Sequence, residues 1–215
     1  MTQVFDFKEA DVMTCHAWNK DCSQLAMSPR SNELFIYKYD GRGTLTFSEK
    51  LIAHTQRINS VDWCPVKNRI ITAGADRNVY VWNLISNKWT KTLVIMRSNR
   101  AAVSVQWSYN GEKFACGCAS RLLAIAYYDE KNNWWTSKLI KKKIRSTVTC
   151  VSWSPDLAVI ACGTSGFKAR IFGTIIKDYD KFVPTSKWSD NLNVGNPIQD
   201  YTCGKLIKFD VNEDI

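Results

Sequence analysis

The residues that most resemble catalytic groups in this 215-residue chain are His54, Thr72 and Asp76. A hydroxyl, a histidine and an aspartate form the catalytic triads of hydrolases, in which the imidazole accepts the proton of the nucleophile. The chain has no G-x-S-x-G nucleophile elbow, and its one other histidine is His16. We therefore predict that no residue is catalytic, and an enzyme is the function class that the sequence favours least.

Metal and cofactor chemistry have equally little support. The eight cysteines are scattered without a C-x-x-C pair, and the two histidines do not fall at zinc-finger spacing. Several of the cysteines stand inside apolar, strand-like runs, where a thiol packs as a small hydrophobic group. We expect neither a metal site nor a disulfide framework, and no cofactor.

The strongest pattern in the chain is a repeat of tryptophan at the end of a short alternating run. The four residues are Trp18, Trp63, Trp107 and Trp153, spaced 45, 44 and 46 residues apart. A period of about 40–45 residues is typical of one four-stranded propeller blade. Because a single blade cannot bury its own apolar faces, neighbouring blades must stack.

Each repeat shows the same order of patterns. A first strand alternates up to the tryptophan, a small apolar second strand follows, and a third strand ends on an aromatic residue before a polar turn. We predict an all-β propeller of about four blades, each with four antiparallel strands. The expected domain covers residues 1–195, with repeats at about 10–50, 51–95, 96–141 and 142–190, and residues 196–215 form a divergent tail.

The second repeat resembles a WD repeat in its polar residues. In WD-repeat propellers a histidine, a hydroxyl, a turn aspartate and a tryptophan form a buried hydrogen-bond relay, and His54, Thr72, Asp76 and Trp82 match them. Ala53 precedes the histidine where Gly is usual, and Asn83 follows the tryptophan where Asp is usual. The resemblance implies a structural role for these four side chains.

Longer motifs narrow the resemblance. Residues from about 10 to 190 are similar to the WD-repeat subunit 1 family of the actin-related protein 2/3 complex. The motifs that carry this similarity are Cys15–Asn19, Gly74–Trp82, Asn99–Ala102, Trp134-Trp135 and Ile144–Val148.

This resemblance implies a non-enzymatic scaffold in cytoplasmic, actin-associated assemblies that nucleate branched filaments. Members of the family form a seven-bladed propeller that holds other subunits, touches the actin filament through a late-blade helical insertion and helps to receive acidic tails of activators. The match ends after about four blades, so the contact through the insertion does not carry over. We therefore expect an open, incomplete ring.

The last residues allow two interpretations. Residues 206–211 alternate like a strand that could pair with residues 4–7, although an incidental apolar tail on a truncated product is the simpler interpretation. Two alternative functions also stay open, a WD-repeat adaptor of another assembly (a ubiquitin-ligase receptor or a trafficking coat) and a non-functional truncated copy. The N-terminal residues show no secretory signal, and no apolar run is long enough to span a membrane.

The net charge of +9 and the pI near 9.1 favour acidic partners. In a propeller the turns between second and third strands share one face with the connections between blades. We predict that this face binds protein through the following residues: Arg77, Arg97, Arg100, Arg121, Lys141, Lys142, Lys143, Arg145 and Lys168.

Four tryptophans outside the repeat pattern are predicted to be freer for surface contacts: Trp89, Trp134, Trp135 and Trp188. Trp89 and Trp135 stand at matching points of outer strands, where they could anchor another subunit. Since most tryptophans recur at the blade period, they should belong to the core instead of stacking on bases. Specific nucleic-acid recognition is therefore not expected.

Overall fold

The computed structural model describes residues 7, 12–177, 179, 180 and 194. These residues form fifteen strands and no helix. The strands build four antiparallel sheets with the orders β1-β2-β3-β4, β5-β6-β7-β8, β12-β11-β10-β9 and β13-β14-β15. Each sheet is a meander in which strands adjacent in sequence pair with each other. The predicted all-β fold, an incomplete propeller of about four blades, is confirmed.

The first blade contains β1 (Met13–Trp18), β2 (Gln24–Pro29), β3 (Glu33–Tyr39) and β4 (Leu45–Ile52). The second blade contains β5 (Ile58–Trp63), β6 (Arg69–Gly74), β7 (Val79–Ile85) and β8 (Lys88–Val94). The third blade contains β9 (Ala102–Trp107), β10 (Lys113–Cys118), β11 (Leu122–Asp129) and β12 (Trp134–Ile140). The fourth blade contains β13 (Val148–Trp153), β14 (Val159–Thr164) and β15 (Lys168–Gly173).

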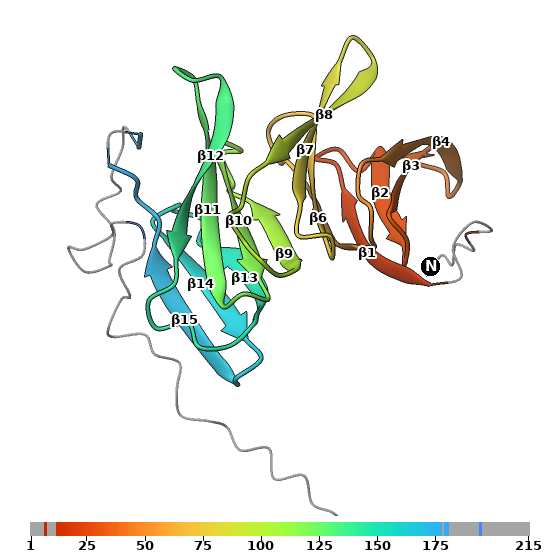
Figure 1. The fold of residues 1–215 in the computed structure, drawn as a ribbon. Coiled ribbons are helices and arrows are strands. Elements are labelled where there is room, and N and C mark those ends of the chain that lie inside the picture. Colours follow the sequence, from red (N-terminus) through yellow and green to blue (C-terminus); the bar gives the residue numbers. More distant parts are fainter. Residues whose placement is uncertain (1–6, 8–11, 178, 181–193, 195–215) are drawn as a thin grey trace, which may run out of the picture.

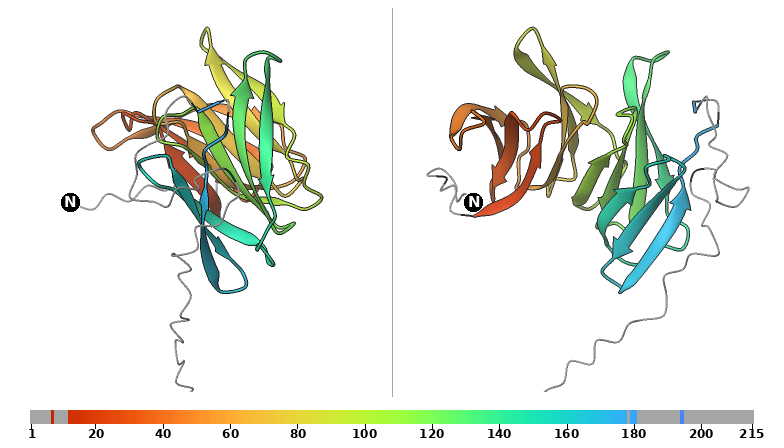
Figure 2. Two further views of the ribbon diagram at one scale, coloured as in Figure 1. Left: turned by 90° about the vertical axis from the view of Figure 1, so that its left-hand side faces the viewer. Right: turned by 180° about the vertical axis from the view of Figure 1, so that it is seen from behind.

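The four blades stand side by side in an arc, which Figures 1 and 2 show from three directions. Neighbouring blades meet mainly through their first strands, β1 against β5, β5 against β9 and β9 against β13. The hairpins β7–β8 and β11–β12 project at one side of the arc, and the β14–β15 turn lies at the other (Figure 1). The arc therefore has two edges, each built from a different kind of turn.

The core lies between the sheets, because alternate residues of one strand face opposite neighbours. In β11, Leu122 and Ala124 pack toward the second blade, while Leu123 and Ile125 pack toward the fourth. All four side chains are at least 98% buried. A strand buried on both faces reads as a continuous apolar run, as β11 does.

A polar side chain before the repeat tryptophan ties each inner blade to the next. The Trp107 amide donates to Asp62 Oδ2 at 2.6 Å, and the Trp153 amide donates to Gln106 Oε1 at 3.1 Å. Asp62 and Gln106 occupy the same position of their repeats, one residue before Trp63 and Trp107. The repeat period thus sets a bond between blades as well as the strands within each blade.

The two end blades differ from the inner ones. Trp18 is 39% exposed, whereas Trp63, Trp107 and Trp153 are 3–4% exposed, because among the described residues no neighbouring blade covers the face of the first blade on which Trp18 lies. In the fourth blade the described residues include three strands and not the predicted four. The proposed pairing of residues 206–211 with 4–7 falls, apart from Phe7, outside the described residues.

Candidate functional site

Two groups of sequence-predicted residues, the polar relay of the second blade and the basic residues of the turns, are candidates for a site. The relay residues come from the segment before β5 (His54), from β6 (Thr72), from the β6–β7 turn (Asp76) and from β7 (Trp82). The structure brings all four together. His54 Nδ1 lies 3.0 Å from Asp76 Oδ1, His54 Nε2 lies 2.9 Å from Thr72 Oγ1, and Trp82 Nε1 donates to Thr72 Oγ1 at 3.1 Å.

The direction of the relay follows from what each group can do. The indole N–H only donates and an ionised carboxylate only accepts. A neutral His54 with its proton on Nδ1 therefore donates to Asp76 and accepts the Thr72 hydroxyl proton, while Thr72 accepts from Trp82. Burial lowers the pKa of His54, although Asp76 opposes this effect, so the neutral imidazole fits the site.

Asp76 is held by backbone groups as well. The amides of Thr55 and Asn78 donate to its two oxygens at 3.0 and 3.1 Å. Burial alone would raise the pKa of Asp76, but the hydrogen bonds from His54, Thr55 and Asn78 outweigh it and lower the pKa. Gly74 leaves the space for this arrangement, because a Cβ there would stand 2.3 Å from His54 Nδ1.

The relay satisfies polar groups in the core and does not form an open reaction centre. His54 is 2% exposed and Thr72 is fully buried, so no substrate can reach the hydroxyl without opening the blade. A buried network with every member bonded stabilises one packing arrangement. The geometry therefore supports the structural role that the WD-repeat resemblance implied.

The basic residues lie on one edge of the arc, which we call the connection edge and define as residues 53–57, 75–78, 95–101, 119–121, 141–147 and 165–167. Backbone hydrogen bonds hold each connection against the turn of the same blade. Ala75 N donates to Arg57 O, Ala119 N to Ala101 O and Ser165 N to Thr147 O, each at 2.9 Å. This common bond places equivalent turns of three blades at the same edge.

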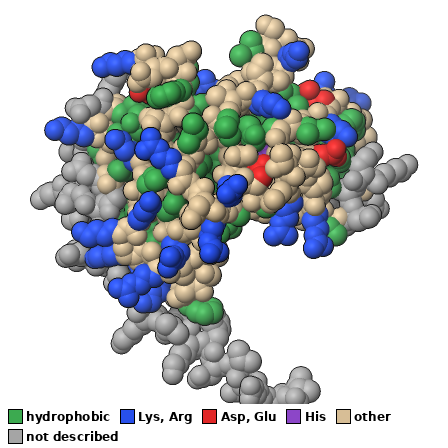
Figure 3. All heavy atoms as spheres, in the orientation of Figure 1, with side chains coloured by type: hydrophobic (Ala, Val, Ile, Leu, Met, Phe, Trp, Pro, Cys, Tyr) green, Lys and Arg blue, Asp and Glu red, His purple; other side chains and the backbone are tan. Residues whose placement is uncertain are grey.

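The connection edge is strongly cationic. Its cations are all exposed and comprise Arg57, Arg77, Arg97, Arg100, Arg121, Lys141, Lys142, Lys143 and Arg145. Its one carboxylate is Asp76, which the relay engages. Figure 3 shows lysine and arginine side chains gathered at the lower left of the view, around the β14–β15 turn.

Two details of this edge differ from the sequence prediction. The residue of the fourth blade that matches Arg77 and Arg121 is Phe167, since all three have a positive φ, of 72°, 60° and 55°. The predicted Lys168 is exposed one position later, at the start of β15. The prediction also omitted Arg57, which its place before the first strand of the second repeat could have indicated.

The two predicted anchor tryptophans are not available on the surface, which corrects that prediction. Trp89 is 9% exposed and packs edge-on against Trp63, with ring centroids 5.8 Å apart. Trp135 is 7% exposed and packs against Trp107 at 5.7 Å. Both indoles fill the space between blades, whereas the neighbouring Trp134 is 59% exposed. Trp188 lies outside the described residues.

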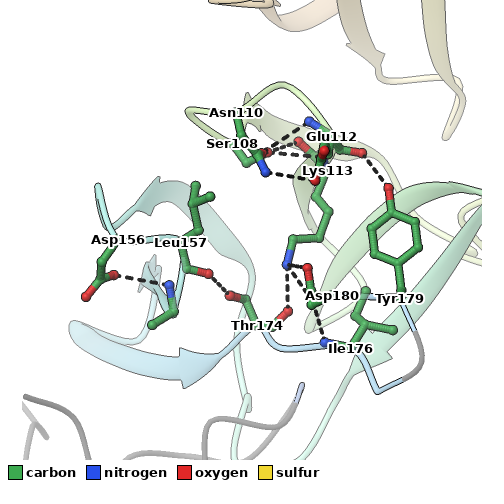
Figure 4. A network of polar contacts seen from close by, with 11 residues as sticks. Ser108, Asn110, Glu112, Lys113, Asp156, Leu157, Thr174, Ile176, Tyr179 and Asp180 are labelled. Carbon is green, nitrogen blue, oxygen red and sulfur yellow. Dashed lines mark hydrogen bonds and ion pairs between the residues drawn. The ribbon is translucent and has the colours of Figure 1, made fainter. Parts of the chain in front are cut away.

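The structure also contains a third set of bonded polar residues, which the sequence analysis did not predict. Lys113, at the start of β10, is 1% exposed, and its ammonium group donates to Asp180 Oδ1 at 2.8 Å and to the Thr174 carbonyl at 3.1 Å. Asp180 also accepts the Ile176 amide, and Tyr179 donates to the Glu112 carbonyl. Figure 4 shows Lys113 reaching from the third blade to the segment that follows β15. No motif connects residues 67 positions apart, so the sequence carried no signal for this pair.

Neither a metal site nor a membrane-spanning helix has a candidate in the described part of the chain. Across residues 12–177 and the few described beyond them, no three His, Cys, Asp or Glu side chains are grouped as a metal would require. In the same residues no helix of membrane-spanning length and apolarity was found.

Comparisons with known proteins agree with the fold and the motifs. The family described as WD domain, G-beta repeat matches residues 45–83 and 139–172. Each match begins in the outer strand of one blade and ends in the third strand of the next, so the sequence repeat is offset from the blade by one strand.

Several curated relatives carry one name. The chain is 43% identical to actin-related protein 2/3 complex subunit 1A-B of Xenopus laevis over 189 residues, which is 88% of this chain and 51% of the relative. It is 43% identical to subunit 1A of Arabidopsis thaliana over 80% of the chain and 45% of the relative. It is 39% identical to subunit 1 of Saccharomyces cerevisiae over 89% and 50%.

The chain spans about half the length of the curated relatives it matches. Within that half, the similarity to subunit 1 of the actin-related protein 2/3 complex that the motifs indicated is confirmed. The relatives' shared name does not favour the alternative of an adaptor in another assembly.

Proposed function

We propose that this WD-repeat relative of subunit 1 of the actin-related protein 2/3 complex is a non-enzymatic scaffold subunit of such a complex. In this role it holds other subunits at cytoplasmic actin, contributes to the nucleation of branched filaments and receives acidic segments of activators on its connection edge. The observation that carries the last part is the charge of that edge, nine exposed cations against one engaged carboxylate.

The opposite edge gives a comparison within the same molecule. We call it the hairpin edge and define it as residues 19–23, 40–44, 64–68, 86–87, 108–112, 130–133 and 154–158. Its carboxylates, Asp21, Asp40, Glu112, Glu130 and Asp156, nearly balance its cations, Lys20, Arg42, Lys67 and Lys131. The positive potential is therefore concentrated on the connection edge, where it would speed the arrival of an acidic segment.

Charge reversal on the connection edge tests this proposal. The triple variant Arg97→Glu, Arg100→Glu and Arg145→Glu should weaken binding of a fluorescein-labelled acidic activator peptide by at least about tenfold at physiological ionic strength. The matched control is Lys20→Glu, Arg42→Glu and Lys88→Glu, which changes three exposed cations away from the connection edge. If both triple variants lose affinity equally, the net charge of the chain and not the connection edge explains the effect. If the first triple variant loses no affinity, the proposed site is wrong.

Assembly is tested separately. An affinity-tagged chain expressed in cells should co-purify with actin-related subunits, and the connection-edge triple variant should co-purify equally well if docking uses other surfaces. Recovery of ubiquitin-ligase or coat components without actin-related subunits would instead support the adaptor alternative.

A further inference from the structure

A groove on the hairpin edge, between the second and third blades, differs in chemistry from its surroundings. Its volume is about 600 Å³, and its walls are the β5–β6 turn, the β7–β8 hairpin and the β11–β12 hairpin. The two hairpins project next to each other at the top of Figure 1. The lining comprises Lys67, Asn68, Arg69, Asn83, Leu84, Ile85, Thr92, Tyr128, Asn133 and Trp135, a set with two cations and no carboxylate.

The two cations of the groove are free to pair with a ligand. Neither Lys67 nor Arg69 forms an ion pair with any residue that the structure describes. Lys67 is exposed and Arg69 is half-buried, and both residues line the same groove. A single carboxylate would neutralise one of them, whereas a phosphoryl group carries about −1.5 to −2 charges at neutral pH.

The neutral polar groups add donors to the same wall. The side-chain oxygen of Asn68 accepts from Trp63 Nε1 at 3.1 Å, and that of Asn133 accepts from the Tyr128 hydroxyl. Because each amide uses its oxygen within the fold, its N–H groups are what it can offer a ligand. A tetrahedral group with three strong acceptor oxygens suits such a surface better than a planar carboxylate with two.

One residue of the groove carries an acceptor atom that needs a hydrogen-bond donor. Asn83 Oδ1 is buried and accepts no hydrogen bond from any described residue. Asn83 pairs with Arg69 across β6 and β7, so the two side chains lie on the same face of the sheet. Leaving the Asn83 oxygen unpaired costs about 1–3 kcal/mol, and a backbone N–H of a bound peptide would satisfy it.

We propose that this groove binds a phosphorylated serine or threonine in an extended segment of a partner protein. Lys67 and Arg69 bind the phosphoryl group, Asn83 Oδ1 accepts a backbone N–H of the segment, and the exposed side chain of Ile85 contacts a flanking side chain. The site is separate from the connection edge and does not depend on the role proposed for it.

Fluorescence anisotropy with two pools of short degenerate peptides tests this site on the full-length chain. One pool has a central phosphoserine and the other a central serine. The phosphorylated pool should bind at least about tenfold more tightly, and the Lys67→Ala and Arg69→Gln variants should each remove most of that difference. Thermal unfolding of both variants checks that the blade is intact.

Further variants separate the parts of the proposal. Asn83→Leu should weaken binding of the phosphorylated pool, because it removes the acceptor for the backbone N–H of the peptide. The connection-edge triple variant should bind the phosphorylated pool like the unmodified chain. Equal binding of both pools would overturn the proposal, as would full binding by a Lys67→Ala/Arg69→Gln double variant. If inorganic phosphate competes as effectively as the peptide, the groove is a site for free phosphate and the proposed peptide site is wrong.

Discussion

The polar relay of the second blade and the Lys113 network satisfy buried polar groups in different ways. Both place a basic group beside an aspartate in the interior, His54 with Asp76 and Lys113 with Asp180. The relay closes within one blade and involves a base that burial keeps neutral. The Lys113 network joins two blades and involves an ammonium group that is 1% exposed. The relay within one repeat is thus a hydrogen-bonded chain with a neutral base, while the long-range contact depends on a buried ion pair.

Removing one partner of the ion pair should lower the free energy of unfolding more than removing one member of the relay. Asp180→Ala leaves the Lys113 ammonium buried without a counter-charge, and we expect a loss of about 3–5 kcal/mol in the free energy of unfolding. Lys113→Met should cost less, because the side chain of Asp180 is 11% exposed and its carboxylate can reach water. Denaturant titration of both variants measures the difference. A larger loss for Lys113→Met would show that packing of the lysine stem, and not the charge, decides the contact.

The relay should respond to a smaller and purely polar change. Thr72→Val keeps the shape of the side chain but removes the acceptor for Trp82 and the donor for His54, so the free energy of unfolding should fall by about 1–3 kcal/mol. Thr72→Ser keeps the hydroxyl and serves as the control. In the Thr72→Val/Lys113→Met double variant the losses should add within about 0.5 kcal/mol, since the two networks share no residue. Strong coupling would show that the blades do not stabilise their networks independently.

The smallest expected effect is a pH dependence in which two groups of the second blade oppose each other. Burial lowers the pKa of His54, so the unfolded chain takes up a proton first and stability falls as the pH drops below about 6.5. Burial raises the pKa of Asp62 from 3.8 to about 6, so the folded chain takes up this proton first and stability rises as the pH falls through that range.

Asp62→Asn separates these two contributions. The amide oxygen can still accept the Trp107 N–H, but the rising contribution disappears. The free energy of unfolding of this variant should therefore fall more steeply between pH 7 and pH 5 than that of the unmodified chain, by at most about 1.4 kcal/mol per pH unit. Parallel curves from denaturant titrations across this range would count against the assigned shifts.

The repeat pattern explains which features could be predicted from the sequence. The relay follows from the resemblance of the second repeat to a WD repeat, and the connection edge follows from turns that stand at fixed positions of the repeats. Trp134 and Trp135 show where this reasoning stops. Strand alternation requires that one of two neighbouring side chains face the core, but it does not say which, and the structure buries Trp135. Lys113 and Asp180 are joined by tertiary packing alone, which no periodic pattern reports.

The bonds that Asp62 and Gln106 accept from the next blade also have a geometric consequence. They join the blades along their first strands, β5 to β9 and β9 to β13, so adjacent sheets diverge with distance from these strands. Openings between blades are then widest at the outer rim, where the β7–β8 and β11–β12 hairpins stand. A substitution of Asp62 or of Gln106 would therefore change the width of the opening at its own junction, without altering a residue that lines that opening.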